Sequence, residues 1–105
     1  MEIQVVTFRL RGMTPERYEA LCDELAPDVA ALPGLISTDW LADESTNTYG
    51  GVYTWRDRSA IETFLKSDLF RLLANHPHLA DITSRVFSVL QSPSAVTARA
   101  RAVAA

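Results

Sequence analysis

The 105-residue sequence contains a single cysteine, Cys22, and few cationic side chains. One cysteine excludes an intramolecular disulfide and a thiolate cage for a metal ion. Ten Lys and Arg residues stand against 13 Asp and Glu residues, which gives a net charge of -3. Proteins that bind nucleic acid normally present a basic face, so the composition argues against a nucleic-acid partner.

Long hydrophobic runs are also missing, and none approaches the length that spans a membrane. The N-terminus begins directly with a strand pattern rather than with a basic region and an apolar run, so we expect a cytoplasmic protein. A glycine loop that cradles phosphate, a Gly-x-Ser-x-Gly elbow and a Cys-His couple are absent as well. The sequence therefore demands no nucleotide, flavin or haem, and we expect no cofactor.

What is present is the hydrophobic pattern of one small domain of the α+β class. Strand periodicity, helix caps and turn residues predict the order β-α-β-β-α-β, the ferredoxin-like subunit with a four-stranded antiparallel sheet. We expect one domain over residues 1–92 and a C-terminal tail over 93–105, which includes Arg99 and Arg101. The predicted elements are strands Ile3–Leu10, Leu35–Ala42, Tyr49–Arg56 and Asp81–Leu90, a helix capped by Thr14 that kinks or restarts at Pro27, and a helix capped by Asp57 and recapped at Ser67.

The first strand is apolar on both of its faces, with Ile3 and Val5 on one and Val6 and Phe8 on the other. Two helices can cover only one face of a four-stranded sheet, and soluble monomers rarely expose a large apolar patch. The pattern therefore predicts a homodimer in which a second copy covers the other face.

Aromatic residues gather in the hairpin that follows. If the hairpin closes around residues 43–48, Trp40 lies opposite Gly51, and Tyr53 and Trp55 project on the same face as Trp40. Such a set either packs the sheet or forms a pocket for a flat, apolar substrate. On the second interpretation the substrate-binding residues are Trp40, Tyr53 and Trp55, with Tyr18 reaching the pocket from the first helix.

Two further side chains are candidates for acid-base or charge-stabilising roles. His76 and His78 flank Pro77, and without a third ligand at a recognisable spacing this pair does not predict a metal site. His76 can act as a general base or simply be solvated. Arg85, in the middle of a strand, can hold a phenolate in a pocket, extend to the sheet edge, or pair with Asp39.

The sequence resembles the YdhR-like mono-oxygenases of the dimeric α/β-barrel superfamily, which includes antibiotic-biosynthesis mono-oxygenases. The resemblance covers nearly the whole chain and implies a ferredoxin-like subunit, a homodimer that forms a dimeric α/β barrel, and oxygenation of a quinol-like or polycyclic aromatic substrate of polyketide type, often without metal or flavin. The residues that carry it are Pro33 and Gly34, Trp40, the run from Gly50 to Asp57, Phe64 and Leu65, Val86 to Val89, and Ser94 and Thr97.

Haem-degrading relatives use an Asn, a Trp and a His, and this chain departs from that set. Thr7 stands where the Asn is wanted, and the second helical segment carries Phe64 and Phe70 but no Trp. The resemblance therefore does not extend to haem oxygenation.

The leading hypothesis is a cofactor-independent mono-oxygenase that takes a small aromatic substrate and molecular oxygen, with Arg85 or His76 handling the developing negative charge. The alternatives are a non-catalytic, small-molecule-binding accessory dimer, and an isomerase or cyclase on a similar substrate.

Overall fold

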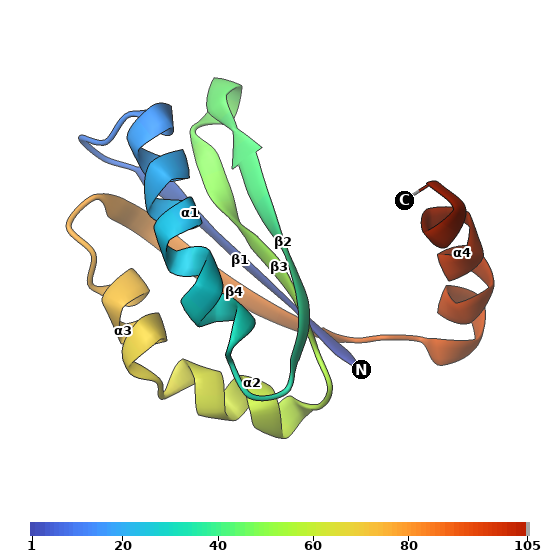
Figure 1. Ribbon diagram of the computed structural model, residues 1–105. Coiled ribbons are helices and arrows are strands. Elements are labelled where there is room, and N and C mark those ends of the chain that lie inside the picture. The colour runs from blue at the N-terminus through green and yellow to red at the C-terminus, as the bar shows by residue number, and fades with distance from the viewer. Residues whose placement is uncertain (105) are drawn as a thin grey trace.

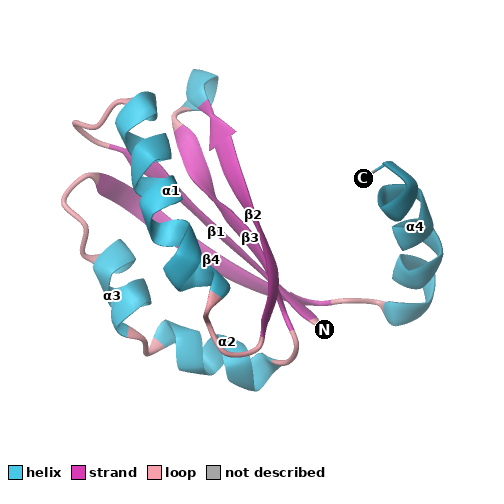
Figure 2. Cartoon of the chain, in the orientation of Figure 1, coloured by secondary structure: helices cyan, strands magenta, loops and turns pink. Residues whose placement is uncertain are grey.

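Four antiparallel strands form one sheet in the order β2-β3-β1-β4 (Figure 1). The computed structural model describes residues 1–104, with the side chains of residues 1–98. This is the predicted ferredoxin-like βαββαβ order, followed by a C-terminal helix (Figure 2). The elements are β1 (Glu2–Leu10), α1 (Pro15–Ala30), β2 (Leu35–Asp43), the short 3₁₀ helix η1 (Glu44–Thr46), β3 (Thr48–Trp55), α2 (Arg58–Leu65), α3 (Asp68–Ala74), β4 (Leu79–Ser88) and α4 (Gln91–Ala104).

The helices of the body begin at the capping residues that the sequence indicates. The side chains of Thr14, Asp57 and Ser67 each accept a hydrogen bond from the backbone N–H three residues further on. These bonds satisfy donors that the first turn of a helix cannot pair internally. At Pro27 the prediction was wrong in one respect, because α1 continues through the proline to Ala30 and does not restart.

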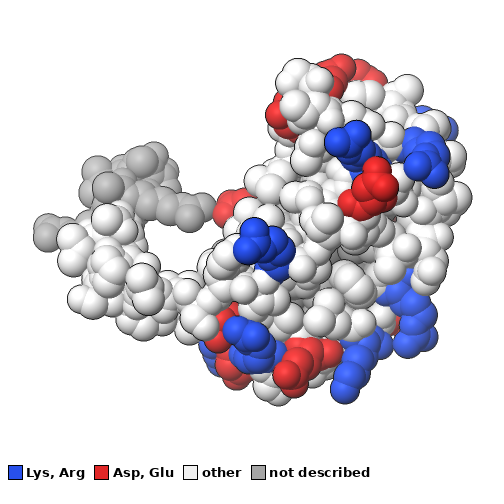
Figure 3. All heavy atoms as spheres, turned by 180° about the vertical axis from the view of Figure 1, so that it is seen from behind, with Lys and Arg blue, Asp and Glu red and all other residues white. Residues whose placement is uncertain are grey.

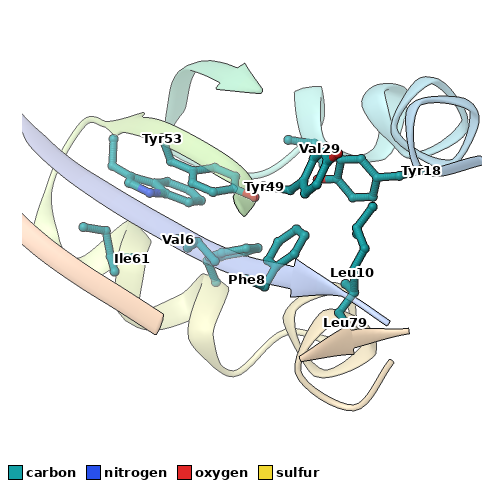
Figure 4. Packing of buried hydrophobic residues seen from close by; sticks show 11 residues of the cluster. Val6, Phe8, Leu10, Tyr18, Val29, Tyr49, Tyr53, Ile61 and Leu79 are labelled. Carbon is teal, nitrogen blue, oxygen red and sulfur yellow. The ribbon is translucent and has the colours of Figure 1, made fainter. Parts of the chain in front are cut away.

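The core lies between the sheet and helices α1, α2 and α3. One buried polar side chain, Gln4, is paired there through both amide atoms: its Oε1 accepts from Trp55 Nε1 at 3.1 Å and its Nε2 donates to Ser84 Oγ at 3.0 Å. The cluster in Figure 4 consists of Val6, Phe8, Leu10, Tyr18, Val29, Tyr49, Tyr53, Trp55, Ile61, Phe64 and Leu79.

The other face of the sheet points away from these helices. Ile3, Val5 and Val52 share this face and are half-buried, and Phe87 is 44% exposed on it. Seen from behind, uncharged side chains make up most of the surface (Figure 3). We call this the open face of the sheet.

The C-terminal helix α4 stands apart from the two-layered body (Figure 1). Leu90 and Val96 are 74% and 72% exposed, and the backbone N–H of Val89 donates to the carbonyl of Met1 at 3.1 Å just before α4 begins. The division into a domain of residues 1–92 and a tail of 93–105 stays a prediction. The tail cations Arg99 and Arg101 have side chains outside the described residues.

Within residues 1–104, no helix has the length and apolar character that crossing a membrane requires.

Candidate functional site

A cleft of about 480 Å³ opens between α1 and the β2–β3 hairpin. We call it the outer cleft. Its walls come from the first three turns of α1, from the distal part of β2 and from the start of β3. The lining residues are Pro15, Tyr18, Glu19, Cys22, Asp23, Ala26, Trp40, Leu41, Ala42, Glu44 and Tyr49.

The floor of the outer cleft is aromatic. The rings of Tyr18 and Tyr49 meet edge to face with their centroids 5.1 Å apart, and the Phe8 ring also contacts Tyr18 edge to face, at 5.7 Å (Figure 4). Tyr18 lies here because α1 presents one helical face to the sheet, and Tyr49 because alternate β3 residues face the helices. Edge-to-face contact is a favoured arrangement of aromatic rings, so the three rings stabilise one another in the floor.

Burial makes two polar groups of the cleft harder to ionise. Burial, and then the hydrogen bond with Cys22, raises the pKa of the Tyr18 hydroxyl well above its usual range. Burial also raises the pKa of the Cys22 thiol, against the opposing effect of the hydrogen bond with Tyr18. A low-dielectric environment disfavours the charged form of either group, so at neutral pH both are neutral hydrogen-bonding groups.

Trp40 forms the exposed wall of the cleft. It pairs with Gly51 across the hairpin, as the sequence predicts, and is 39% exposed because β2 is an edge strand. A side chain at position 51 would crowd the Tyr53 ring, since an added Cβ would lie 3.2 Å from it. The glycine therefore leaves room for the Tyr53 ring on the helix-facing side of the hairpin.

The charged groups that line the outer cleft are all carboxylates. Glu19 and Asp23 come from α1 and Glu44 from η1, and no Lys, Arg or His is among the lining residues. The cleft therefore repels anions, and the cost of a ligand carboxylate placed close to each of these groups is on the order of 1 kcal/mol or more.

A second depression of about 290 Å³ continues the outer cleft along α1 and β2. We call it the inner hollow. It shares Ala26 and Trp40 with the outer cleft, so the two are neighbours with Trp40 between them. Its other lining residues are Val29, Ala30, Leu35, Ile36, Ser37 and Thr38.

Thr38 contributes an unusual group to this region. Its Oγ1 has less than 1 Å² of exposed surface and has no hydrogen-bond partner among the described residues. Buried hydroxyls are normally paired, because an unpaired one costs about 1–3 kcal/mol.

The structure brings two of the predicted binding residues, Trp40 and Tyr18, into one cleft. It places Tyr53 and Trp55 on the same face, as expected, but in the core at 5% and 0% exposure. Phe64 of α2 covers both of them, with ring centroids 5.5 Å and 5.2 Å away.

The two predicted catalytic residues lie elsewhere in the subunit. Arg85 is on the open face of the sheet, opposite Val5 of β1, with its guanidinium 5.1 Å from the ring centroid of Phe87. His76 lies in the loop between α3 and β4, where its Nδ1 accepts from the backbone N–H of His78 at 3.1 Å. Neither lines the outer cleft, and their catalytic roles stay predictions.

Sequence reasoning missed Tyr49, Cys22, the three carboxylates and Thr38. A signal existed for two of them: Tyr49 has the same strand parity as Tyr53, and Cys22 lies one helical turn after Tyr18. Nothing local marks the carboxylates or Thr38, because their place depends on how α1 lies against β2.

No cluster of three or more His, Cys, Asp or Glu side chains suited to hold a metal ion occurs within the described part of the chain.

The family described as "Putative mono-oxygenase ydhR" matches residues 3–100. No curated protein matches the chain.

Similar solved structures include the heme-degrader MhuD from Mycobacterium tuberculosis with two hemes in its active site. MhuD is 16% identical to this chain, with a TM-score of 0.69, and the match covers 88% of this chain and 98% of MhuD. A variant of SnoaB, a cofactor-independent oxygenase from Streptomyces nogalater, is 22% identical, with a TM-score of 0.66 and coverage of 87% and 95%. An antibiotic biosynthesis monooxygenase is 18% identical, with a TM-score of 0.66 and coverage of 86% and 99%. At these identities the similarity shows a common fold.

Proposed function

Because the chain belongs to the ydhR family, which matches residues 3–100, we propose that it is a homodimeric mono-oxygenase that uses neither metal nor flavin. Its substrate is a quinol-like or polycyclic aromatic compound of polyketide type. The observation that carries this proposal is the outer cleft, whose aromatic walls suit a flat ring system. The SnoaB structure supports the absence of a cofactor by analogy only.

The outer cleft has the size and lining of a small-molecule site. Its volume of about 480 Å³ lies within the range that ligand pockets commonly have. Trp40 on one wall and Tyr18 and Tyr49 on the floor offer ring faces and edges against which a planar substrate can stack. Because only carboxylates are charged there, the substrate is uncharged or cationic in our account.

The chemistry needs little from the protein when the substrate is electron-rich. An anthrone-type methylene passes a proton to a cleft carboxylate, so the net charge of the cleft does not change, and the delocalised anion that remains passes one electron to O2. The resulting radical pair combines to a hydroperoxide, and loss of water leaves a carbonyl. The balance is CH2 + O2 → C=O + H2O, so the substrate supplies all the electrons and no external reductant is consumed.

The cleft then has to bind the substrate, accept its proton and exclude water. Tyr18 and Cys22 ordinarily titrate above neutral pH and burial raises their pKa values further, so both are protonated and neither is a base. We assign proton abstraction to a carboxylate among Glu19, Asp23 and Glu44, and hydrogen-bond donation to the substrate oxygen to Tyr18. The sequence instead suggested Arg85 or His76 as the residue that handles the developing negative charge, and this is the competing assignment.

The open face of the sheet supports the homodimer. Ile3, Val5, Val52 and Phe87 present apolar surface there, while α1, α2 and α3 all lie on the opposite side. A two-fold contact between two open faces buries this surface without further elements. Two sheets packed in this way form the closed barrel that the resemblance implies.

Oxygen uptake tests the proposal. The full chain, treated with chelator and freed of flavin, is incubated with anthrone and with a panel of hydroquinones. We expect consumption of one O2 for each molecule of anthraquinone formed, and an unchanged rate in Arg85→Ala and His76→Ala. Tight binding without uptake would favour the accessory binder, and a rearranged product formed without oxygen would favour the isomerase or cyclase.

A further inference from the structure

The outer cleft and the inner hollow together form a longer groove than a ring system alone would fill. Both lie between α1 and the edge strand β2, and they meet at Ala26 and Trp40. The outer cleft is aromatic with a rim of carboxylates. The inner hollow is mostly aliphatic and is lined by no ionisable side chain. The groove therefore fits a ligand with two chemically different parts.

The second observation is the unpaired hydroxyl beside the inner hollow. Thr38 lies on the helix-facing side of β2, opposite Tyr53, and its methyl group points toward Gly51, because an added Cβ there would lie 3.5 Å from Thr38 Cγ2. Its Oγ1 is buried without a partner, although the residue lines the hollow. A valine of the same shape would avoid this penalty, so folding alone gives no reason for the hydroxyl.

We propose that Thr38 is a specificity-determining residue that donates a hydrogen bond to a carbonyl on a side arm of the substrate. The polycyclic ring system stacks in the outer cleft against Trp40, and a short arm enters the inner hollow. Binding of the arm requires a turn about the Cα–Cβ bond of Thr38 that directs its hydroxyl, which is buried in the free chain, into the hollow. The substrate class is thus an uncharged polycyclic aromatic that bears an acyl arm.

This inference deepens the proposed function and rests on the outer cleft as the substrate site. It concerns binding alone, so its test requires no turnover. Two probes of nearly the same shape differ only in the acceptor: 2-acetylanthracene carries a carbonyl where 2-isopropenylanthracene carries a methylene. Their dissociation constants for the full chain are measured from the fluorescence of the anthracene.

The wild-type chain should bind the acetyl probe about fivefold more tightly, the factor that one net hydrogen bond of ordinary strength gives. Thr38→Ser should keep this preference, and Thr38→Val should lose it while binding the isopropenyl probe as before. Ala30→Leu, which fills the inner hollow, should remove the preference independently. Thr54→Val, on the open face of the sheet, is the matched control and should change neither constant.

Folding stability provides the second readout. Because the Thr38 hydroxyl has no partner in the folded chain, Thr38→Val should raise the melting temperature by a few degrees. A lower melting temperature, an unchanged preference in Thr38→Val, or no binding of either probe by the wild type would overturn the inference. Oxygen uptake that persists in those cases would leave the proposed function standing. Binding that depends on Thr38 but comes without oxygen uptake would support the inference and contradict the proposed function.

Discussion

At the scale of single residues, Trp40 is the side chain whose removal separates ligand binding from folding. It is 39% exposed at the sheet edge, whereas Trp55 has no exposed surface and donates to Gln4. Trp40→Ala should lower the melting temperature much less than Trp55→Ala does, because Trp40 is partly exposed, and it should raise the KM for anthrone about tenfold because the stacking surface is lost. Steady-state oxygen uptake and thermal unfolding measure the two effects. If this variant keeps the wild-type KM, the substrate does not bind in the outer cleft.

Tyr53 allows a prediction about alkaline pH. Burial raises its pKa from 10.0 to about 12, so between these values the unfolded chain loses a proton that the folded chain retains. The free energy of unfolding should therefore be unaffected by this group below pH 10 and fall by up to about 1.4 kcal/mol per pH unit between pH 10 and about 12. Urea unfolding at several pH values measures the slope. Tyr53→Phe should lose less stability over the same range, and an identical loss would contradict the assignment.

At the scale of elements, the sequence was enough to predict the hairpin but not which part of it the helices cover. Turn residues and strand parity predicted the Trp40–Gly51 pair and the common face of Tyr53 and Trp55, and the structure confirms both. Parity does not show which part of that face the helices cover. Phe64 of α2 closes over Tyr53 and Trp55, while Trp40 lies on an edge strand beside the open part of the groove.

Long-range placement explains the other differences between sequence and structure. Cap residues act within one helical turn, so Thr14, Asp57 and Ser67 could be identified locally. The unpaired hydroxyl of Thr38 and the carboxylates of the outer cleft depend on the position of α1 against β2, and no spacing along the chain encodes that position. An irregularity in β4 was likewise not predicted: Asp81 has a φ of 56° where the pairing with β1 shifts.

The helix α4 gives a prediction about the extent of the domain. It stands apart from the body, and Leu90 and Val96 are largely exposed. A chain that ends at Ser92 should therefore fold, with a free energy of unfolding within about 0.5 kcal/mol of the full chain, as expected for loss of surface residues. Circular dichroism and urea unfolding test this. A truncated chain that fails to fold would show that residues 93–105 belong to the domain.

At the scale of the whole molecule, the open face of the sheet should determine the oligomeric state. Val52 is central on this face, between β1 and β2 in the sheet order. Val52→Lys would place a charge in the dimer contact, where burying it is costly. Sedimentation at micromolar concentration should show a wild-type dimer and a folded Val52→Lys monomer. The exposed substitution Arg17→Lys on α1 serves as the control, and a wild-type monomer would contradict the barrel.

Incorporation of isotopic oxygen tests the mono-oxygenase assignment most directly. Full-length protein free of metal and flavin is supplied with anthrone under ¹⁸O2, and the anthraquinone formed is analysed by mass spectrometry early in the reaction. We predict that each product molecule carries one labelled oxygen and that the rate depends on Trp40. A product whose new oxygen comes from water, or a rate no higher than that without protein, would contradict the assignment.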